Sequence, residues 1–342
     1  MNMSKTFTSR LSDLNLKYLM GKLSSDGQKV KHPFWVIVEK EISDHFRSVR
    51  FMILMGIVIL TCMGSLYSSL SNFSEVVKNS EDEFFFLRLF TSTDGAMPSF
   101  VVFLSFLGPL LGIGLGFDAI NSEQNSGTLS RIMSQPIHRD NLINAKFLGA
   151  LIVISILFFA LGFLVMGFGL FFIGIPPTAE EFLRFICFTI ISILYVAFWL
   201  NLAILFSVKF RQASTSALAG IGVWLFFTVF YGLIVNLIAK AKAPAQFAPP
   251  EVVIKYQVFV KNLMSIVPSQ LYSDATTTLL RPSVRSLGPL TMEQMAGAIP
   301  NPIPLGQSLL LVWPQLTGLI AAAVLCFALT YHMFMRREIR SK

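Results

Sequence analysis

The sequence predicts an all-α polytopic membrane protein with six transmembrane helices, and three observations lead to this fold class. Of the 342 residues, 54% are hydrophobic and only 13% are charged, whereas ordinary soluble domains carry about 25% charged residues. The mean hydropathy is +0.66, and six apolar runs are long enough to cross a bilayer as helices. Such a chain cannot cover its surface with polar groups in water. A soluble enzyme, a disordered regulator and a secreted disulfide module are therefore excluded.

The six apolar runs define a transmembrane domain over 51–334, with a polar arm over 1–31 before it and a basic tail over 335–342 after it. Each run approaches or exceeds the roughly 20 residues that a spanning helix needs. The third run is long enough to require a tilt, a kink or an extension past the bilayer. The runs are 51–70, 98–117, 147–175, 184–207, 216–238 and 308–334.

The distribution of Lys and Arg predicts which loops face the cytoplasm. With the N-terminus inside, the inside segments hold 18 of the 27 basic residues, and the short outside loops with the flanking Arg184 hold three. Because cytoplasmic loops carry the excess of basic residues, both termini are expected in the cytoplasm. The net charge of +8 then reflects topology, and no nucleic-acid partner is expected. The inside segments are 1–50, 118–146, 208–215 and 335–342; the short outside loops are 71–97 and 176–183.

Ionisable side chains are missing from the centres of all six runs, since every Asp, Glu, Lys and Arg lies in a loop, in a tail or at the edge of a run. Ion-coupled carriers, voltage sensors and ion pumps usually place such groups near the membrane midplane. The sequence therefore argues against an ion-driven carrier or channel. Energy for any transport is expected to arrive from outside the membrane domain.

No catalytic or metal-binding cluster emerges from the sequence. The three cysteines fall one per apolar run, without a Cys-x-x-Cys or Cys/His arrangement, and are expected to be packing residues. The acidic run at 81–83 lacks the ligand spacing of a calcium loop. The histidines are scattered over different segments, so no Ser/His/Asp or paired-carboxylate arrangement supports a membrane enzyme. These residues are Cys62, Cys187, Cys326, His32, His45, His138 and His332.

An amphipathic helix is expected over 32–50, directly before the first apolar run. Pro33 suits the first turn of a helix, and apolar residues then recur at spacings of three and four. We expect this helix to lie along the inner membrane surface, with an ordinary cytoplasmic packing helix as the alternative. The apolar positions are Trp35, Val38, Ile42, Phe46 and Val49.

The second run carries a stripe of small residues, Gly108, Gly112 and Gly116, with Pro109 beside it. Small residues four apart let another helix approach closely. Packing within this subunit is the expected role of the stripe. A mobile or kinked helix, helped by Pro109 and Gly114, is the alternative.

The loop 118–146 carries an unusual number of helix signals for a connector. Asp118, Asn121 or Ser122 can cap a short helix, Gly127 breaks it, and the residues 128–133 can form a second one before Pro136 stops it. Short helices held under a membrane domain would present a docking surface to a cytoplasmic partner. A plain connector is the alternative.

The loop 239–307 is the largest outside element and is expected to be helical. One helix is predicted over 251–267 and another after Pro268, as re-entrant or surface helices that form an extracytoplasmic cap. The closely spaced prolines over 298–304 suggest an extended return to the last run.

The residues from Phe117 to Arg139, FDAINSEQNSGTLSRIMSQPIHR, are followed by Lys146 and Phe147. This pattern resembles the permease subunits of type-2 ABC transporters, in particular the subgroup resembling the nitrous-oxide-reductase maturation permease. The outer segment 268–282 is also similar to that subgroup. Gln124 departs from the basic residue that often follows the Glu of the motif, which affects partner contacts. The motif positions are occupied by Asp118, Glu123, Gly127, Thr128, Leu129, Pro136, Arg139 and Lys146.

The resemblance implies an amphipathic "elbow" helix, a coupling helix over about 119–135, and a dimer with a second permease subunit, identical or different. Two copies of a separate P-loop ATPase subunit, with ATP and Mg²⁺, would dock on the coupling helix. The chain itself has no G-x-x-x-x-G-K-[ST] motif, so no cofactor is expected in it. An inner or plasma membrane location is also implied. The expected docking residues are Asp118, Glu123, Gly127, Thr128, Leu129, Arg131, Pro136 and Arg139.

The function expected from these observations is export of an amphipathic or hydrophobic substrate, driven by the separate ATPase. Trp199, Trp224 and Tyr231 could line such a path, although packing or lipid-facing roles are alternatives. One alternative function is transmission of force to an extracytoplasmic partner. Another is a lipid-modifying membrane enzyme, which the scattered polar residues disfavour. Substrate-binding residues are not assigned.

Overall fold

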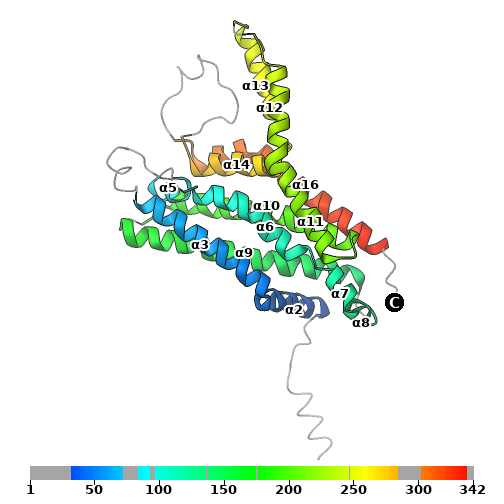
Figure 1. The fold of residues 1–342 in the computed structure, drawn as a ribbon. Helices are drawn as coiled ribbons and strands as arrows, with labels where there is room; N and C mark the ends of the chain where they lie inside the picture. Colours follow the sequence, from blue (N-terminus) through cyan, green and yellow to red (C-terminus); the bar gives the residue numbers. More distant parts are fainter. Residues whose placement is uncertain are drawn as a thin grey trace, which may run out of the picture.

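The computed structural model describes residues 32–71, 84–92, 97–135, 138–174, 176–245, 247–283 and 302–336, and within these ranges every regular element is a helix. Six helices are long and apolar enough to span a membrane. The predicted fold class is therefore confirmed (Figure 1). The six are α3 (Val49–Ser71), α6 (Phe100–Gly116) with the turn and short helix that continue it to Asn125, α9 (Arg139–Ile173), α10 (Ala179–Lys209), the bent helix made of α11 (Ala213–Leu225), η1 (Phe226–Phe230) and α12 (Tyr231–Ala241), and α16 (Leu305–Arg336).

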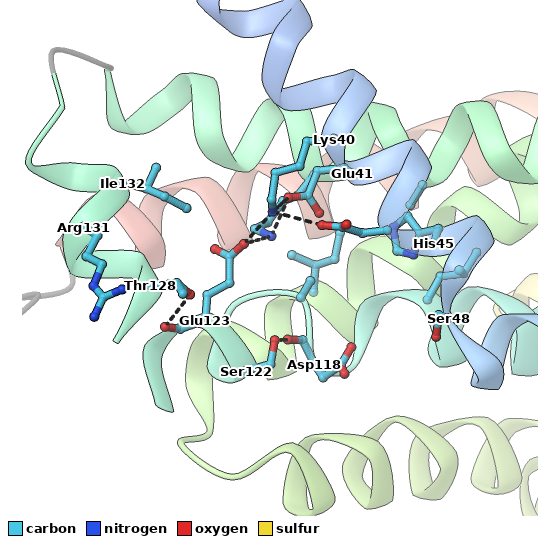
Figure 2. Close-up of a pocket in the computed structure, with 16 residues that line it drawn as sticks. Lys40, Glu41, His45, Ser48, Asp118, Ser122, Glu123, Thr128, Arg131 and Ile132 are labelled. Carbon is cyan, nitrogen blue, oxygen red and sulfur yellow. Dashed lines mark hydrogen bonds and ion pairs between the residues drawn. The ribbon is translucent and has the colours of Figure 1, made fainter. Parts of the chain in front are cut away.

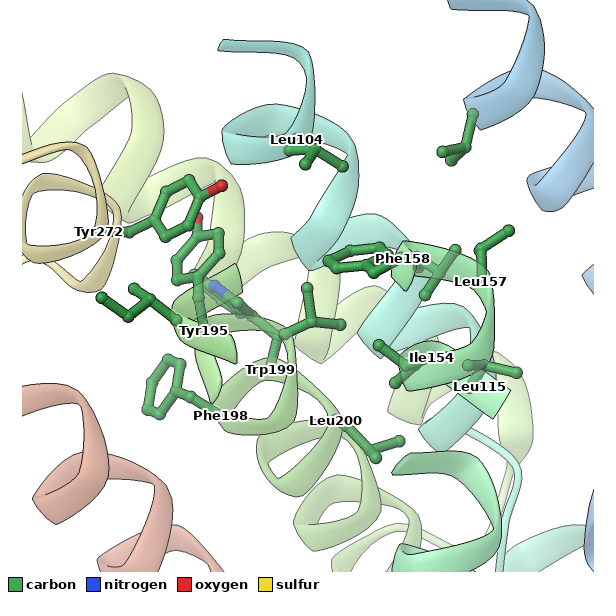
Figure 3. Close-up of a cluster of buried hydrophobic side chains, with 14 of the residues drawn as sticks. Leu104, Leu115, Ile154, Leu157, Phe158, Tyr195, Phe198, Trp199, Leu200 and Tyr272 are labelled. Carbon is green, nitrogen blue, oxygen red and sulfur yellow. The ribbon is translucent and has the colours of Figure 1, made fainter. Parts of the chain in front are cut away.

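The helix α10 is the central element of the bundle. It packs against α6, α9 and α16, and 78% of its most apolar stretch is buried, as expected of a helix enclosed by others. Figure 3 shows Tyr195, Phe198, Trp199 and Leu200 of α10 beside side chains from α6 and α9. Trp199 is 1% exposed, so it is a packing residue of the bundle in this chain.

The glycine stripe of α6 faces α10 at very close range. A Cβ atom added to Gly112 would lie 2.8 Å from the carbonyl oxygen of Val196, and one at Gly116 would lie 2.8 Å from that of Leu200. A Cβ atom at Gly108 would lie 2.9 Å from the Cγ2 atom of Val196. The stripe therefore lets two backbones meet inside this subunit.

Two short helices of the predicted outer loop have different surroundings. Helix α14 (Pro268–Leu280) packs against α10 and α16, and half of its residues are buried. Helix α13 (Pro250–Met264) has no buried residues. It forms a hairpin with α12 that projects from the bundle (Figure 1), joined by a hydrogen bond of 2.9 Å from the Tyr256 hydroxyl to the carbonyl of Ala239.

Several helix boundaries differ from those expected. The helix α2 (Pro33–Arg47) ends three residues early, because Ser48 is extended and α3 begins at Val49. Helices α9 and α10 begin before their apolar runs, at Arg139 and Ala179. An apolar run shows only the part of a helix that lies inside the bilayer. The helix itself can continue through polar turns beyond that part, so it can begin before the run.

The two ends of the bundle carry different short elements (Figure 1). One end holds α2, the helices α7 (Asn121–Asn125) and α8 (Thr128–Met133), and the C-terminal end of α16; we call it the α7–α8 end. The other holds α5 (Phe85–Thr91) and α14 and is called the α5–α14 end. The arm 1–31, the acidic run 81–83, Pro136 and residues 337–342 of the tail lie outside the described residues.

Candidate functional site

The loop between α6 and α9 folds into two short helices with a sharp turn at Gly127. This residue has φ of +71°, in the left-handed region that favours glycine. Hydroxyl groups close the turn, since Ser126 and Thr128 donate to the carbonyl of Glu123 at 3.2 Å each. The α7–α8 loop, residues 117–135, thus has the helix, break and second helix that the sequence predicts.

Two groups, one at the end of α10 and one directly after it, hold this loop in place. The hydroxyl of Ser207 accepts hydrogen bonds from the backbone N–H groups of Ile120 at 2.9 Å and Asn121 at 3.2 Å. The side-chain amide of Asn125 donates to the carbonyl of Arg211 at 3.1 Å. Ser207 lies in an apolar run far along the chain, and no sequence signal connects it to this loop.

A buried lysine joins three separate elements at this end, where Lys40, Glu41 and Glu123 lie close together (Figure 2). Lys146, in the second turn of α9, has a side chain that is only 4% exposed. Its Nζ atom lies 3.1 Å from Oε1 of Glu41 on α2 and 2.8 Å from Oε1 of Glu123 on α7. A second lysine, Lys40, belongs to α2. Its Nζ atom lies 3.1 Å from Oε1 of Glu41, 3.2 Å from Oδ2 of Asp44 and 3.5 Å from Oε1 of Glu123. We call these five residues the charge cluster.

Two members of the charge cluster, Glu41 and Lys40, have shifted pKa values. Burial would raise the pKa of Glu41, but the positive charges of Lys146 and Lys40 outweigh it and hold that pKa below its ordinary value. Burial would lower the pKa of Lys40, and the neighbouring carboxylates outweigh it in the same way and raise that pKa. For the adjacent His45, burial dominates and lowers the pKa. At neutral pH Glu41 and Lys40 are therefore ionised and His45 is uncharged.

A cavity of about 510 Å³ lies beside the charge cluster, between α2, the end of α6, the α7–α8 loop and α9. Its walls carry four carboxylates against three basic side chains. The carboxylates are Glu41, Asp44, Asp118 and Glu123, and the basic residues are Lys40, Arg131 and Lys146. Among the described residues, no group of His, Cys, Asp and Glu has the arrangement of a metal site.

The expected docking residues fall into an outward and an inward set. Gly127, Thr128 and Arg131 are exposed. Leu129 is 2% exposed and belongs to the core, and the carboxylate of Glu123 is turned toward the two lysines.

The remaining expected docking residues have other surroundings. Asp118 pairs with Arg50 at the start of α3, Arg139 is half-buried, and Pro136 lies outside the described residues. Glu41 and Lys40, which the motif does not include, belong to the same cluster.

A second buried network, at the α5–α14 end, was not expected from the sequence. The sequence predicts that Arg184 flanks an outer loop, but in the structure it lies in the second turn of α10 with no exposed surface. Its guanidinium pairs with Glu180 at 2.8 Å, and it also donates to the carbonyls of Leu279 at 2.9 Å and Ile303 and to the Ser308 hydroxyl at 3.1 Å. Arg184 therefore ties α10 to α14 and α16.

Two comparisons with known proteins agree with this architecture. A family model described as ABC-2 family transporter protein matches residues 35–339. The protein named "Probable ABC transporter permease protein NosY" from Stutzerimonas stutzeri is 23% identical over 296 residues, which cover 85% of this chain and 96% of that protein. The protein of the same name from Pseudomonas aeruginosa is 26% identical over 205 residues, covering 58% of this chain and 68% of that protein.

The family match covers most of α2, the six long helices and the α7–α8 loop between the second and third of them. The chain belongs to the ABC-2 transporter family and is a membrane permease subunit of an ABC transporter.

Proposed function

We propose that this chain couples ATP hydrolysis by two copies of a separate P-loop ATPase subunit to export of an amphipathic or hydrophobic substrate. A second permease subunit, identical or different, would complete the membrane part of the complex. The observation that carries the proposal is the α7–α8 loop. It projects at one end of the bundle and is fixed to α10 through Ser207 and to α2 and α9 through Lys146.

The orientation proposed for the complex puts the α7–α8 end in the cytoplasm and the α5–α14 end outside. The excess of basic residues in the segments at the α7–α8 end supports it. Both termini would then be cytoplasmic, and the protein would be a multi-pass protein of an inner or plasma membrane, surrounded by lipid.

The ATPase is proposed to dock on the outward face of the α7–α8 loop, which places Gly127, Thr128 and Arg131 at the contact. Arg131 offers a charged donor for a partner carboxylate. The inward set, Glu123 and Leu129, would act on docking indirectly by holding the loop in shape. Asp118, through Arg50, would have the same supporting role.

The substrate class is proposed from the character of the spans. The bent helix of α11, η1 and α12 exposes a large apolar surface that includes Leu218, Val229 and Phe230, and such a surface suits an amphipathic or hydrophobic molecule. Two aromatic residues of this bent helix have partners within the chain: Trp224 packs on Phe106, and the hydroxyl of Tyr231 donates to the carbonyl of Leu263 at 2.8 Å. Both are accounted for as packing residues.

A second candidate function is transmission of force to an extracytoplasmic partner. The hairpin of α12 and α13 favours it, because it projects beyond the bundle (Figure 1) and ends near Phe247, which is 95% exposed. In that case ATP hydrolysis would move the hairpin with little passing through the membrane.

The first test is purification of the tagged chain in mild detergent, followed by mass spectrometry of the proteins that co-purify. A P-loop ATPase in equal amount is expected, and recovery of the chain alone from several detergents would contradict the proposal. Arg131→Glu is expected to reduce the recovered ATPase by at least about tenfold, because it reverses a charge at the contact. The control, Lys209→Glu, changes an exposed lysine at the end of α10 and is expected to leave recovery unchanged.

The two candidate functions are separated by reconstitution of the complex in vesicles. With export, ATP is expected to drive movement of a fluorescent amphiphile such as rhodamine 6G across the bilayer. With force transmission, ATP hydrolysis proceeds without movement of this probe or of fluorescent phospholipids.

A further inference from the structure

The helix α2 and the α7–α8 loop face each other across the 510 Å³ cavity, which separates their backbones. They are far apart in the sequence, and side chains of the charge cluster bridge the space between them (Figure 2). Lys40 reaches from α2 to Glu123, and Lys146 reaches from α9 to both Glu123 and Glu41. Displacement of the loop can therefore be transmitted to α2 through these ion pairs.

Lys146 is the most enclosed member of this bridge. Its side chain is 4% exposed, and those of Glu41 and Glu123 are 9% and 12% exposed. Separating one carboxylate from a buried ammonium group leaves an uncompensated charge, which is strongly unfavourable. The pairs of Lys40 and the bridge between Arg50 and Asp118 are more exposed, at 49% for the Lys40 side chain and 62% for that of Arg50, and water and salt weaken them. The Lys146 pairs are thus the stiffer connection.

We propose that Lys146 is a positioning residue that makes α2, the α7–α8 loop and the start of α9 move as one unit. The inference rests on the proposed function, in which an ATPase displaces the loop. Because α3 begins at Val49, directly after α2, the first span would follow the loop through α2. The second and third spans follow it through the continuous chain. Through Lys146, movement of the ATPase would therefore be transmitted to the first span as well as to the second and third.

Three variants separate this role from simple stabilisation. The triple variant Lys146→Met, Glu41→Gln, Glu123→Gln removes the three charges together and leaves no unpaired buried charge, so it is expected to fold. Lys146→Arg keeps the positive charge between the carboxylates. Lys209→Met is the matched control, because it removes an exposed lysine at the same end that is not part of the cluster.

The experiment measures distances between spin labels in the complete complex with its ATPase, before and after trapping with Mg-ATP and vanadate. Cys62, Cys187 and Cys326 are first replaced by serine. Labels at the exposed positions Arg47 and Gln135 report the spacing of α2 and the loop. Labels at Gln135 and Leu310, which is 76% exposed near the other end of α16, report movement of the loop relative to the bundle.

In the native complex, the distance from Gln135 to Leu310 is expected to change on trapping, while the distance from Arg47 to Gln135 stays the same. In the triple variant the Arg47–Gln135 distance is expected to shift or broaden on trapping, and the Lys146→Arg and Lys209→Met variants are expected to behave like the native complex. A native Arg47–Gln135 distance that changes, or a triple variant that keeps it constant, would overturn the inference. If trapping moves neither distance in the native complex, the proposed function itself fails.

Discussion

The rings of Tyr195 and Tyr272 stack with their centroids 4.5 Å apart and an angle of 12° between their planes. Tyr195 belongs to the central helix α10, and Tyr272 belongs to α14, so the contact fixes the short helix inside the bundle (Figure 3). Each hydroxyl also has a partner. Tyr195 donates to the carbonyl of Ser105 at 2.9 Å, and the Tyr272 hydroxyl lies 2.9 Å from the hydroxyl of Ser192. The segment that follows the projecting hairpin is thereby anchored to the spans.

We expect Tyr272→Ala to lower the free energy of unfolding by about 3–5 kcal/mol, because it removes a fully buried aromatic ring. Tyr272→Phe keeps the ring and is expected to cost about 0.5–1.5 kcal/mol for the lost hydrogen bond. Thermal melting in detergent, followed by size-exclusion chromatography, measures both. Tyr67→Ala serves as the control, since Tyr67 is 77% exposed. Equal losses for the two alanine variants would show that the stack does not hold α14.

Arg184→Met is expected to destabilise the protein by about 3–5 kcal/mol, because it leaves the acceptors at Leu279, Ile303 and Ser308 without their buried donor. Arg184→Lys keeps the charge but lacks the planar fork that reaches several acceptors at once, so an intermediate loss is expected. The same melting assay tests both variants. Arg281, an exposed residue that donates to the carbonyl of Thr91 at 3.2 Å, provides the control Arg281→Met. A native-like melting temperature for Arg184→Met would contradict the role assigned to this network.

Gly112→Ala is expected to cost about 1–3 kcal/mol, because the new methyl group would press on the backbone of α10 and the two helices would have to separate. The matched variant is Gly167→Ala on α9, where an added Cβ atom meets nothing within 4 Å. That substitution is expected to be neutral or to stabilise the helix by up to about 1 kcal/mol. Melting temperatures that fall equally in both variants would mean that general helix effects, and not the α6–α10 contact, explain the loss.

We expect stability to decrease as the pH falls below about 6.5, the ordinary pKa of histidine. The folded protein holds the pKa of His45 below that value, so the unfolded chain takes up the proton first and the loss continues until the pH reaches the folded pKa. Glu41, Lys146, Asp118 and Asp44 are the charged groups around His45. His45→Gln is expected to flatten melting temperatures between pH 7 and the folded pKa. An unchanged pH dependence in this variant would exclude His45 as its source.

A further loss is expected at lower pH from Glu41. Its folded pKa is depressed below its ordinary value of 4.5, so its contribution is complete above that pH and disappears as the pH falls through the folded pKa. Glu41→Gln is expected to lack this acid transition while keeping the one due to His45. Melting curves recorded from pH 5 down to the lowest pH at which the protein stays soluble in detergent distinguish Glu41→Gln from His45→Gln.

Much of the candidate site could be identified from the sequence, but its internal connections could not. The motif included Asp118, Glu123, Gly127 and Lys146, and the turn at Gly127 follows from local chemistry. The motif did not show that Glu123 faces inward, because side-chain direction depends on where α2 and α9 lie. Glu41 looked like one of several charges on the polar face of an amphipathic helix, and only its position against α9 shows that it is buried.

The sequence by itself determined that the chain spans a membrane with six helices. In lipid the backbone hydrogen bonds must be satisfied within each segment, so apolar length alone specifies a spanning helix. Tertiary structure decided which polar residues are buried. Arg184 and Lys146 look like charged residues at the ends of spans, and their partners are distant in the sequence. The burial of a charge requires partners from other helices, and those are defined only when the helices pack together.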